Sequence, residues 1–396
     1  MSNVSSLGLS AANNEFTKDV YQHLAANTPH NAIISPCGLH MVLGLTSYGA
    51  AGSTADAMMK ALRIKHSEAL LNDYKHSIDQ LSKSPELKIA NNNNNNNINN
   101  NATALSNQFD NYVLIDVGAN LTNRKYSRDL ESVVQRAKDA GVQKIIAIGS
   151  SLKSSKEALR LARIYPGMVY STAGIHPHEA KSWDEDYMEQ LRDLASNSEC
   201  VAIGECGLDY SRDFSSPVTQ DMVFEKQLEL ACEVKKPIII HEKAAHEQLV
   251  DILTRYKTQL PATILHSYVG NSQQVRTYLQ LGSYIAINGY LCKDSSEEGL
   301  QAMLESGELP MDRILVESDA PFLYPNARAS KLPLHVRDAI TTKAQTFLQR
   351  YCTFQRNEPC SLPVLIEIIA AFLKKSPEEI ALATSFTALK LFGLSS

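Results

Sequence analysis

Val201-Ala-Ile-Gly-Glu-Cys-Gly-Leu-Asp209 is the stretch from which the fold class of this chain can be inferred. A short apolar run ends at Gly204, and Glu205 follows it directly. Apolar runs of this length are typical of strands that are buried on both faces of a parallel sheet. A carboxylate at the end of such a strand cannot pack in the core unpaired, so it must face water, a partner group or a metal ion.

Three further apolar runs end in a residue type that binds metal ions. Pro237-Ile-Ile-Ile-His241 and Ala262-Thr-Ile-Leu-His266 end in histidine, and Arg313-Ile-Leu-Val-Glu-Ser-Asp319 ends in aspartate. Imidazole nitrogens and carboxylate oxygens together suit Mg²⁺, Mn²⁺ or Zn²⁺. The pattern therefore predicts a mixed nitrogen and oxygen metal site formed by Glu205, His241, His266 and Asp319.

From residue 110 to the end, short apolar runs alternate with longer amphipathic segments, which is typical of an α/β fold. The runs predicted to be strands are Tyr112–Val117, Lys144–Ile148, Val169–Ala173, Val201–Ile203, Pro237–Ile240, Ala262–Leu265, Tyr284–Ile287 and Ile314–Val316. Eight such βα units favour a TIM (β/α)8 barrel of the metal-dependent hydrolase type over an open doubly wound sheet. No GxGxxG or GxxxxGK motif follows any strand, which argues against a sheet that binds a nucleotide cofactor.

The active sites of such barrels lie at the carboxyl-terminal ends of the strands. The residues predicted there are, in chain order, Asn120, Ser150, His176, Glu205, His241, His266, Asn288 and Asp319. A metal ion held in this mouth can activate a water molecule and neutralise charge that develops on a phosphoryl oxygen. The strand ends therefore predict hydrolytic chemistry.

Composition limits the partners and the compartment. The 396 residues are 44% hydrophobic and 20% charged, as in an ordinary globular protein, and the formal net charge is -5. This charge excludes a strongly basic nucleic-acid surface, so bound cations must supply much of any attraction to phosphates. Seven cysteines without a CxxC spacing favour reduced thiols, and no apolar run reaches a membrane-spanning length. We expect no membrane partner and a cytoplasmic location, with the nucleus as the alternative.

The first ninety residues carry a separate pattern. Phe16–Leu24 has helical spacing, Asn31-Ala-Ile-Ile-Ser-Pro36 is a short strand, and Gly49–Ala55 leads into another helix. These segments resemble the N-terminal helices of a serpin, and the resemblance stops near Ala90. No reactive loop follows, although inhibition by loop insertion needs one. We therefore expect a partial serpin-like, mainly helical segment over residues 1–90 without a protease partner.

The next segment is almost pure asparagine. Asn91 to Asn101 is interrupted only by Ile98, and such a composition cannot build a packed core. We predict a disordered linker over residues 91–108 and a barrel domain over residues 109–396.

Seven short motifs are distributed along the predicted barrel and together indicate one family. They are Ile115-Asp-Val-Gly-Ala-Asn-Leu-Thr122, Ser171-Thr-Ala-Gly-Ile-His-Pro-His178, Ala202-Ile-Gly-Glu-Cys-Gly-Leu-Asp209, Ile240-His241, Leu265-His-Ser-Tyr-Val-Gly270, Glu317-Ser-Asp-Ala-Pro321 and Arg356-Asn-Glu-Pro359. They occur in the same order as in the TatD family of metal-dependent deoxyribonucleases, within the amidohydrolase-like barrels, and residues 109–396 therefore resemble that family. The motifs span the whole predicted barrel, and together they are specific for this family.

The resemblance implies an exonuclease that hydrolyses phosphodiester bonds in DNA, acting on single-stranded ends. Glu205, His241, His266 and Asp319 would hold one or two divalent ions, with Mg²⁺ expected and Mn²⁺ or Zn²⁺ as alternatives. Asp319, Glu205 and His176 form the predicted catalytic set. Asp319 would orient or deprotonate the attacking water, and His176 would contact the scissile phosphate or the water.

Further residues are predicted to contact the substrate. They are Lys243, Asn120, His178 and Arg356. At two places the chain departs from its relatives, many of which carry His-x-His after the first strand, where Gly118 and Asn120 stand here. After His241, relatives usually show Arg-Asp where this chain has Lys243-Ala244, which keeps the charge but loses the bidentate guanidinium.

Structural alternatives accompany several of these assignments. Asn120 alternatively makes an Asx turn, and Arg356 alternatively pairs with Glu358 and locks its loop. Tyr210, Phe214 and Tyr268 can either stack on unpaired bases or pack in the protein.

Two other functions compete with the nuclease. A metal-dependent amidase or lactonase on the same barrel usually needs the His-x-His pair and often a carbamylated lysine at a strand end, and the sequence pattern offers neither. An inert barrel fused to a serpin-like fragment would require the loss of a metal ligand, and all four predicted ligands are present.

Overall fold

The computed structural model describes residues 113–394. These residues belong to the second of two units into which the chain divides, 99–396. The predicted serpin-like segment over 1–90 and the predicted linker over 91–108 lie outside the described residues, as does Tyr112 at the start of the first predicted strand.

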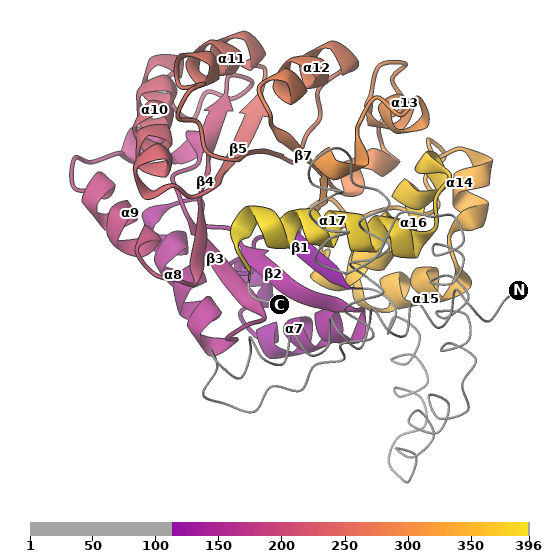
Figure 1. The fold of residues 1–396 in the computed structure, drawn as a ribbon. Helices are drawn as coiled ribbons and strands as arrows, with labels where there is room; N and C mark the ends of the chain where they lie inside the picture. The colour runs from indigo at the N-terminus through magenta and orange to yellow at the C-terminus, as the bar shows by residue number, and fades with distance from the viewer. Residues whose placement is uncertain (1–112, 395–396) are drawn as a thin grey trace, which may run out of the picture. The chain divides into compact units, whose positions relative to one another are not determined.

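Parallel strands form the centre of this unit (Figure 1). They are β1 Leu114–Ala119, β2 Val142–Ala147, β3 Val169–Ala173, β4 Cys200–Asp209, β5 Ile238–Lys243, β6 Thr263–His266, β7 Tyr284–Ile287 and β8 Ile314–Val316. Each strand pairs with the next, in the order β1 to β8. Backbone bonds from Asp319 N to Gly118 O (2.9 Å) and from Asn120 N to Ala320 O (2.7 Å) link the last strand end to the first. The nearly closed sheet confirms the predicted α/β TIM barrel.

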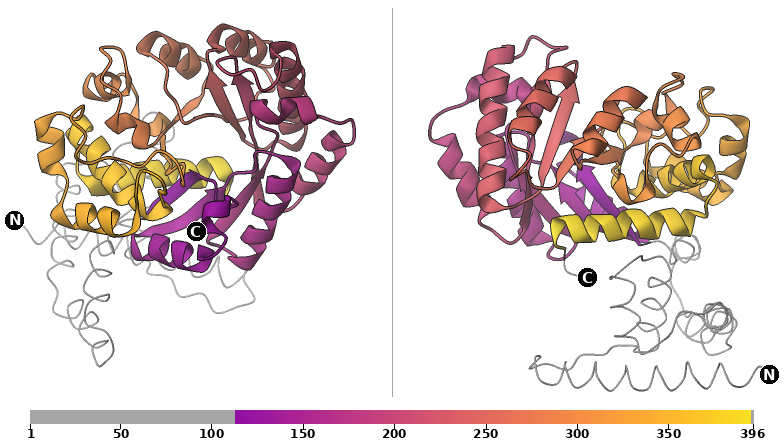
Figure 2. Two further views of the ribbon diagram at one scale, coloured as in Figure 1. Left: turned by 180° about the vertical axis from the view of Figure 1, so that it is seen from behind. Right: turned by 45° about the horizontal axis from the view of Figure 1, so that its top comes forward.

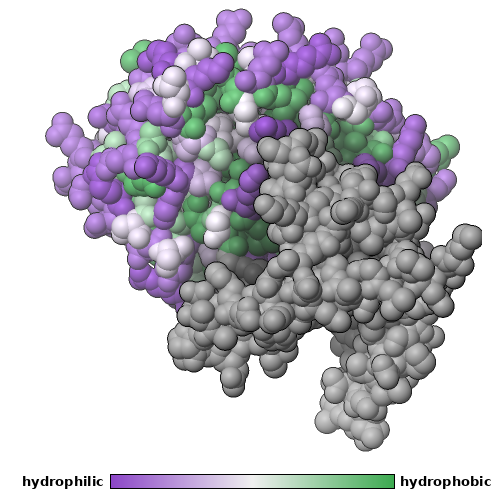
Figure 3. Space-filling model, in the orientation of Figure 1, coloured by the Kyte–Doolittle hydropathy of each residue, from purple (hydrophilic) through white to green (hydrophobic). Residues whose placement is uncertain are grey.

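Helices follow the strands and cover the outside of the sheet (Figures 1 and 2). They are α7 Leu130–Asp139, α8 Leu152–Ile164, α9 Tyr187–Ala195, α10 Pro217–Val234, α11 His246–Arg255, α12 Ser272–Gln280, α13 Leu300–Glu305, α14 Leu334–Ala339, α15 Thr342–Tyr351, α16 Leu362–Leu373 and α17 Pro377–Phe392. On the face that Figure 3 shows, hydrophilic residues cover much of the coloured surface. Within residues 113–394, no helix is both long and apolar enough to cross a membrane.

Serine side chains mark where several helices begin. Ser216 precedes α10 and accepts the backbone N–H of Thr219, and Pro217 occupies the first helical position. Ser376 precedes α17 in the same way and forms a reciprocal capping box with Glu379. Both patterns satisfy N–H groups that the first helical turn leaves unpaired.

Helix α17 closes the amino-terminal end of the barrel. Ser385 donates a hydrogen bond to the carbonyl of Val113, the residue before β1 (2.6 Å). Ala388 and Phe392 pack in one cluster with inward-facing strand residues such as Ile115. The turned view shows the yellow helix running along one end of the strands (Figure 2). The opposite, carboxyl-terminal end is therefore the end that is left for a site.

Two strands are longer than the apolar runs predict. β4 continues to Asp209 and β5 to Lys243, so Glu205 and His241 lie within strands rather than behind them. The pairing resumes after a bulge at Gly204 and Glu205 and continues from Cys206 opposite Ile240 to the strand ends. Only glycine fits this path, because Gly204 and Gly207 have φ of 122° and 130°. The ladder therefore carries polar residues into the barrel mouth.

We expect Phe392→Ala to lower the free energy of unfolding of the barrel by roughly 3 kcal/mol, because the ring is buried in the cluster that closes its end. Trp183 is the single tryptophan of the chain, so its fluorescence during urea denaturation reports on the barrel alone. Phe386→Ala is the matched control on the same helix, since that ring is 64% exposed, and it should change stability by less than about 0.5 kcal/mol. Equal losses in the two variants would contradict the closing role of α17.

Candidate metal centre

A cavity of about 410 Å³ opens at the carboxyl-terminal end of the barrel. It brings together all of the predicted strand-end residues except Asn288, namely Asn120, Ser150, His176, Glu205, His241, His266 and Asp319. His178 lines it as well. Glu179, Ser267 and Phe322 also line the cavity, although their sequence patterns do not single them out.

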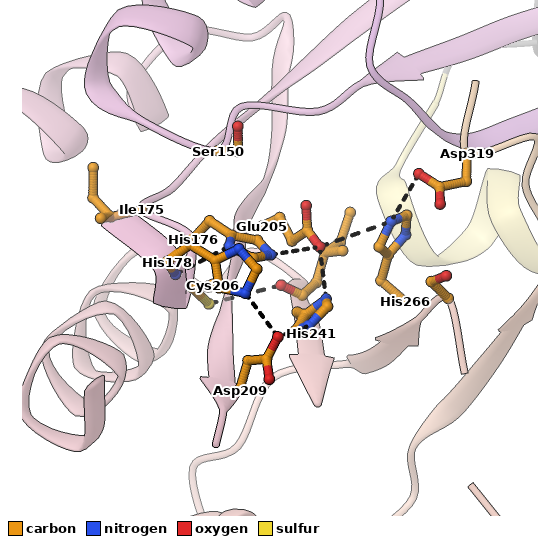
Figure 4. Close-up of polar contacts among 12 residues, drawn as sticks. Ser150, Ile175, His176, His178, Glu205, Cys206, Asp209, His241, His266 and Asp319 are labelled. Carbon is orange, nitrogen blue, oxygen red and sulfur yellow. Dashed lines mark hydrogen bonds and ion pairs between the residues drawn. The ribbon is translucent and has the colours of Figure 1, made fainter. Parts of the chain in front are cut away.

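The carboxylate of Glu205 lies at the centre of this cavity (Figure 4). Its Oε1 atom is 3.3 Å from Nδ1 of His241, 3.5 Å from Nε2 of His176 and 3.9 Å from Nε2 of His266. Asp319 adds a second carboxylate, with Oδ1 3.7 Å from the same His266 nitrogen. Three histidines from separate segments therefore surround one carboxylate, and a fourth segment adds a second carboxylate beside them.

Behind His266 lies a further carboxylate, Glu317, which is fully buried. Its Oε2 atom is 2.6 Å from Nδ1 of His266, and its Oε1 atom accepts bonds from Ser267 N (2.7 Å) and Asn288 Nδ2 (3.0 Å). Because an ionised carboxylate only accepts, the Nδ1 proton of His266 points at Glu317, and the Nε2 atom faces Glu205 and Asp319 in the cavity. The sequence pattern singles out Asp319 and not Glu317, although Glu317 directly follows the same apolar run.

Gly118 explains why the His-x-His pattern is missing here. A Cβ atom at this position would lie 2.8 Å from both Glu317 Oε2 and His266 Cε1. Contacts this short are not tolerated, and both neighbours are held by buried hydrogen bonds. The Glu317–His266 pair thus occupies the space that a side chain at residue 118 would need.

Asp209 holds the corresponding position behind His241. Its Oδ2 atom is 3.5 Å from Nε2 of His241 and 2.7 Å from Nε2 of His178. Its Oδ1 atom accepts bonds from the backbone N–H and the hydroxyl of Ser211. Both His241 and His266 therefore have a carboxylate beside the nitrogen that points away from Glu205, the arrangement that orients histidine ligands in metal sites.

The ring of His176 has a hydrogen-bond donor, and not a carboxylate, beside the nitrogen that points away from Glu205. His176 precedes the 3-10 turn η2, Pro177–Ser182, and its Nδ1 atom accepts the backbone N–H of His178 at 3.1 Å. A neutral imidazole that accepts at Nδ1 carries its proton on Nε2, which here faces Glu205. His176, Glu205 and His241 are close enough together to hold an ion. As placed, however, His176 presents an N–H group to the cavity rather than a lone pair.

Burial and charge shift the titration of these groups. Burial lowers the pKa of His176 to about 4, although Glu205 acts in the opposite direction. Burial would also lower the pKa of His241, but Asp209 and Glu205 raise it to about 9. Burial acts to raise the pKa of Glu205, yet the imidazole rings around it hold that pKa well below its ordinary value. The centre thus attracts positive charge, and a cation that binds His241 must displace a proton.

Two of the predicted substrate contacts do not line the cavity. The Arg356 guanidinium lies 2.7 Å from carboxylate oxygens of both Asp129 and Glu358, in agreement with the loop-locking alternative. Lys243 ends β5 with its side chain exposed to solvent. Asn120 does line the cavity, and its Oδ1 atom accepts the Thr122 hydroxyl as in a local turn.

Known proteins resemble the barrel over its whole length. The sequence model of the family described as TatD related DNase matches residues 115–393. A "3'-5' ssDNA/RNA exonuclease TatD" of Yersinia pseudotuberculosis is 37% identical over 281 residues, which are 71% of this chain and 100% of that protein. Its counterpart of the same name in Pectobacterium parmentieri is 38% identical over the same shares.

Solved structures of TatD-related proteins also resemble the barrel. A TatD homologue from Escherichia coli K12 superposes with a TM-score of 0.61 at 26% identity, covering 72% of this chain and 100% of its own. A TatD family hydrolase from Entamoeba histolytica has a TM-score of 0.62 at 23% identity, with 72% and 99% covered, and supports the fold.

A second family model, for serpins, matches residues 11–147. This match runs beyond the predicted end of the resemblance near Ala90, and its last part overlaps β1, α7 and β2. In the structure these elements are the first units of the barrel, and the TatD model already covers them from residue 115. With that model matched over the entire barrel, the chain belongs to the family of TatD-related DNases.

Proposed function

We propose that this chain is a metal-dependent deoxyribonuclease that shortens single strands from their 3' ends. The observation that carries the proposal is the Glu205 carboxylate, surrounded by imidazoles in the mouth of a TatD-type barrel. The direction and the single-stranded substrate follow from the relatives, which are named 3'-5' ssDNA/RNA exonucleases.

Glu205, His241, His266 and Asp319 are the proposed metal ligands. The residues fit a divalent cation, because both histidines have a carboxylate behind the ring and a nitrogen toward Glu205. When bound, such an ion supplies a Lewis acid that activates water and neutralises charge on a phosphoryl oxygen. We propose Mg²⁺ as the resident ion, at one or two positions, with Mn²⁺ and Zn²⁺ as alternatives that the imidazole ligands also suit.

Asp319 is the proposed group that orients or deprotonates the attacking water. Its backbone has a φ of 48°, which is uncommon for a residue other than glycine. The conformation is held by bonds from its N–H to Gly118 O (2.9 Å) and from Phe322 N–H to its carbonyl (2.8 Å). A strained backbone that neighbouring bonds fix in place is a frequent feature of catalytic residues.

His176 is the proposed donor to the scissile phosphate. Its Nε2–H faces the same point as the metal ligands, and a preorganised donor there stabilises charge that develops on a phosphoryl oxygen. Asn120 and His178 line the cavity and are proposed substrate contacts. For Arg356 we propose the loop-locking role instead, and the phosphate contact of Lys243 stays a prediction.

The amidase or lactonase alternative receives less support from the site. Among the described residues that line the cavity there is no lysine to carry a carbamate. A histidine at residue 118 does not fit beside Glu317 and His266.

We also propose that residues 109–396 form the complete catalytic domain, behind a serpin-like segment over 1–90 and a linker over 91–108. The whole of the Escherichia coli homologue aligns with 72% of this chain, so a barrel exists as a protein without a counterpart of the first segment. The boundary between the two units of the chain, between residues 98 and 99, falls within the proposed linker.

A chain that starts at residue 109 should therefore fold and bind metal as the full chain does. We expect the same urea midpoint by Trp183 fluorescence and the same dissociation constant for Mn²⁺ in both proteins. A truncated chain that is unfolded, or that has lost Mn²⁺ binding, would refute this domain boundary.

Incubation of the folded protein with single-stranded DNA labelled at its 5' end tests the nuclease directly. With Mg²⁺ we expect a ladder of stepwise shortened strands, and with EDTA no shortening. Asp319→Asn should slow the reaction by about 100-fold or more, because it removes the proposed base. A folded protein that shows no metal-dependent shortening would refute the proposed function.

A pair of variants separates the metal ligands from the phosphate donor. Glu317→Gln removes the carboxylate behind His266 and should weaken Mn²⁺ binding by roughly 10- to 100-fold in a calorimetric titration. His176→Gln should leave the Mn²⁺ dissociation constant unchanged while lowering kcat on DNA by about 100-fold. If His176→Gln weakened Mn²⁺ binding as much as Glu317→Gln did, His176 would be a ligand and its assignment as donor would be wrong.

A further inference from the structure

One exposed aromatic ring lines the cavity, and a second packs against a residue that lines it. Of the three aromatic residues that the sequence offers for stacking, Tyr268 is buried and the Tyr210 hydroxyl is bonded to Asp221, whereas Phe214 is 51% exposed. Phe322, which the sequence pattern does not single out, is 47% exposed and lines the cavity. Large apolar rings are thus left in water beside a site made almost entirely of polar groups.

The two rings come from opposite sides of the barrel. Phe214 lies in the loop after β4, with its ring 4.7 Å from the ring of His178. Phe322 lies in the loop after β8, three residues beyond Asp319. Strands four and eight face each other across a barrel of eight strands that pair in sequence order. His178 and Asp319 accordingly lie on opposite sides of Glu205 (Figure 4).

Single exposed aromatic residues are common on protein surfaces and need no function. Phe354 is such a residue, since it is 67% exposed but packs its ring 4.7 Å from Tyr324 and does not line the cavity. Phe214 and Phe322 differ from Phe354, because Phe214 contacts His178, which lines the cavity, and Phe322 lines the cavity itself. Their position is therefore tied to whatever occupies the cavity.

We propose that Phe214 and Phe322 are stacking surfaces for the unpaired bases on either side of the scissile phosphate. This inference rests on the proposed nuclease function and specifies its substrate. The polar groups in the cavity suit a phosphate, whereas an exposed ring suits the face of a base, which every nucleotide offers regardless of sequence. In a duplex those faces are covered by neighbouring bases, so the two rings select a single-stranded end.

A cation stands beside one of these surfaces. The Lys125 Nζ atom lies 5.8 Å from the centroid of the Phe322 ring and donates to the carbonyl of Gln355. A positive charge there places a counter-ion for a backbone phosphate next to the stacked base, on a chain with a net charge of -5.

The test compares Phe214→Ala and Phe322→Ala with the matched control Phe354→Ala on two substrates. One is single-stranded DNA labelled at its 5' end. The other is the same strand with abasic sites at the two nucleotides of its 3' end. On the normal strand, KM should rise about 5- to 30-fold for each of the two variants, with kcat unchanged, while Phe354→Ala behaves as the wild type. On the abasic strand, which offers no bases to stack, all four proteins should have the same KM.

An unchanged KM on the normal strand, or an equal rise on the abasic strand, would overturn the stacking role. If the wild type cleaved neither strand, the proposed function itself would have failed. Binding of the labelled strands, measured by fluorescence anisotropy, would still test the stacking role. A higher dissociation constant of Phe214→Ala and Phe322→Ala for the normal strand alone would support it. Equal dissociation constants of all four proteins would overturn it.

Discussion

The buried carboxylate of Glu205 is the constraint on which the architecture of the mouth depends. A carboxylate with so little access to water is stable only if it is surrounded by groups that compensate its charge, and here His176, His241 and His266 do so at 3.3–3.9 Å. Each histidine arrives from a different segment, so the compensation requires the barrel to be assembled. The glycines at 204 and 207 complete the arrangement, because their positive φ angles let β4 carry Glu205 inward and still pair with β5.

A second layer of buried carboxylates gives the three rings different roles. Glu317 accepts a hydrogen bond from the outward nitrogen of His266, Asp209 lies 3.5 Å from that of His241, and a backbone N–H donates to that of His176. His176 therefore presents a donor to Glu205, whereas His241 must first lose a proton before it presents a lone pair to an ion. The missing side chain at Gly118 belongs to this layer, since the space it leaves is filled by the Glu317–His266 pair. Gly118, which in the sequence looks like the loss of a ligand, leaves the space in which Glu317 and His266 form a buried ion pair.

The sequence predicts the barrel and most of the residues in its mouth because the apolar runs repeatedly end in residue types that bind metal ions. It predicts the strand ends less well, since the continuation of β4 to Asp209 depends on pairing with β5 and not on apolar content. Asp209 and Glu317 act through contacts with residues distant in the sequence, which a linear pattern does not contain. For Arg356 the sequence leaves a substrate contact and an ion pair with Glu358 open, and the second ion pair, with Asp129, is made only in the folded chain. Phe322 gave no signal, because its exposure is a property of the loop after β8.

The most direct test of the central claim is an anomalous diffraction measurement on crystals of the protein grown or soaked with Mn²⁺. We expect an anomalous peak within coordination distance of the Glu205 carboxylate and of at least one of His241 and His266. His176 should contribute no ligand to it. A peak coordinated by His176 without His241 and His266, or the absence of any peak in the cavity at a saturating Mn²⁺ concentration, would contradict the proposed metal centre.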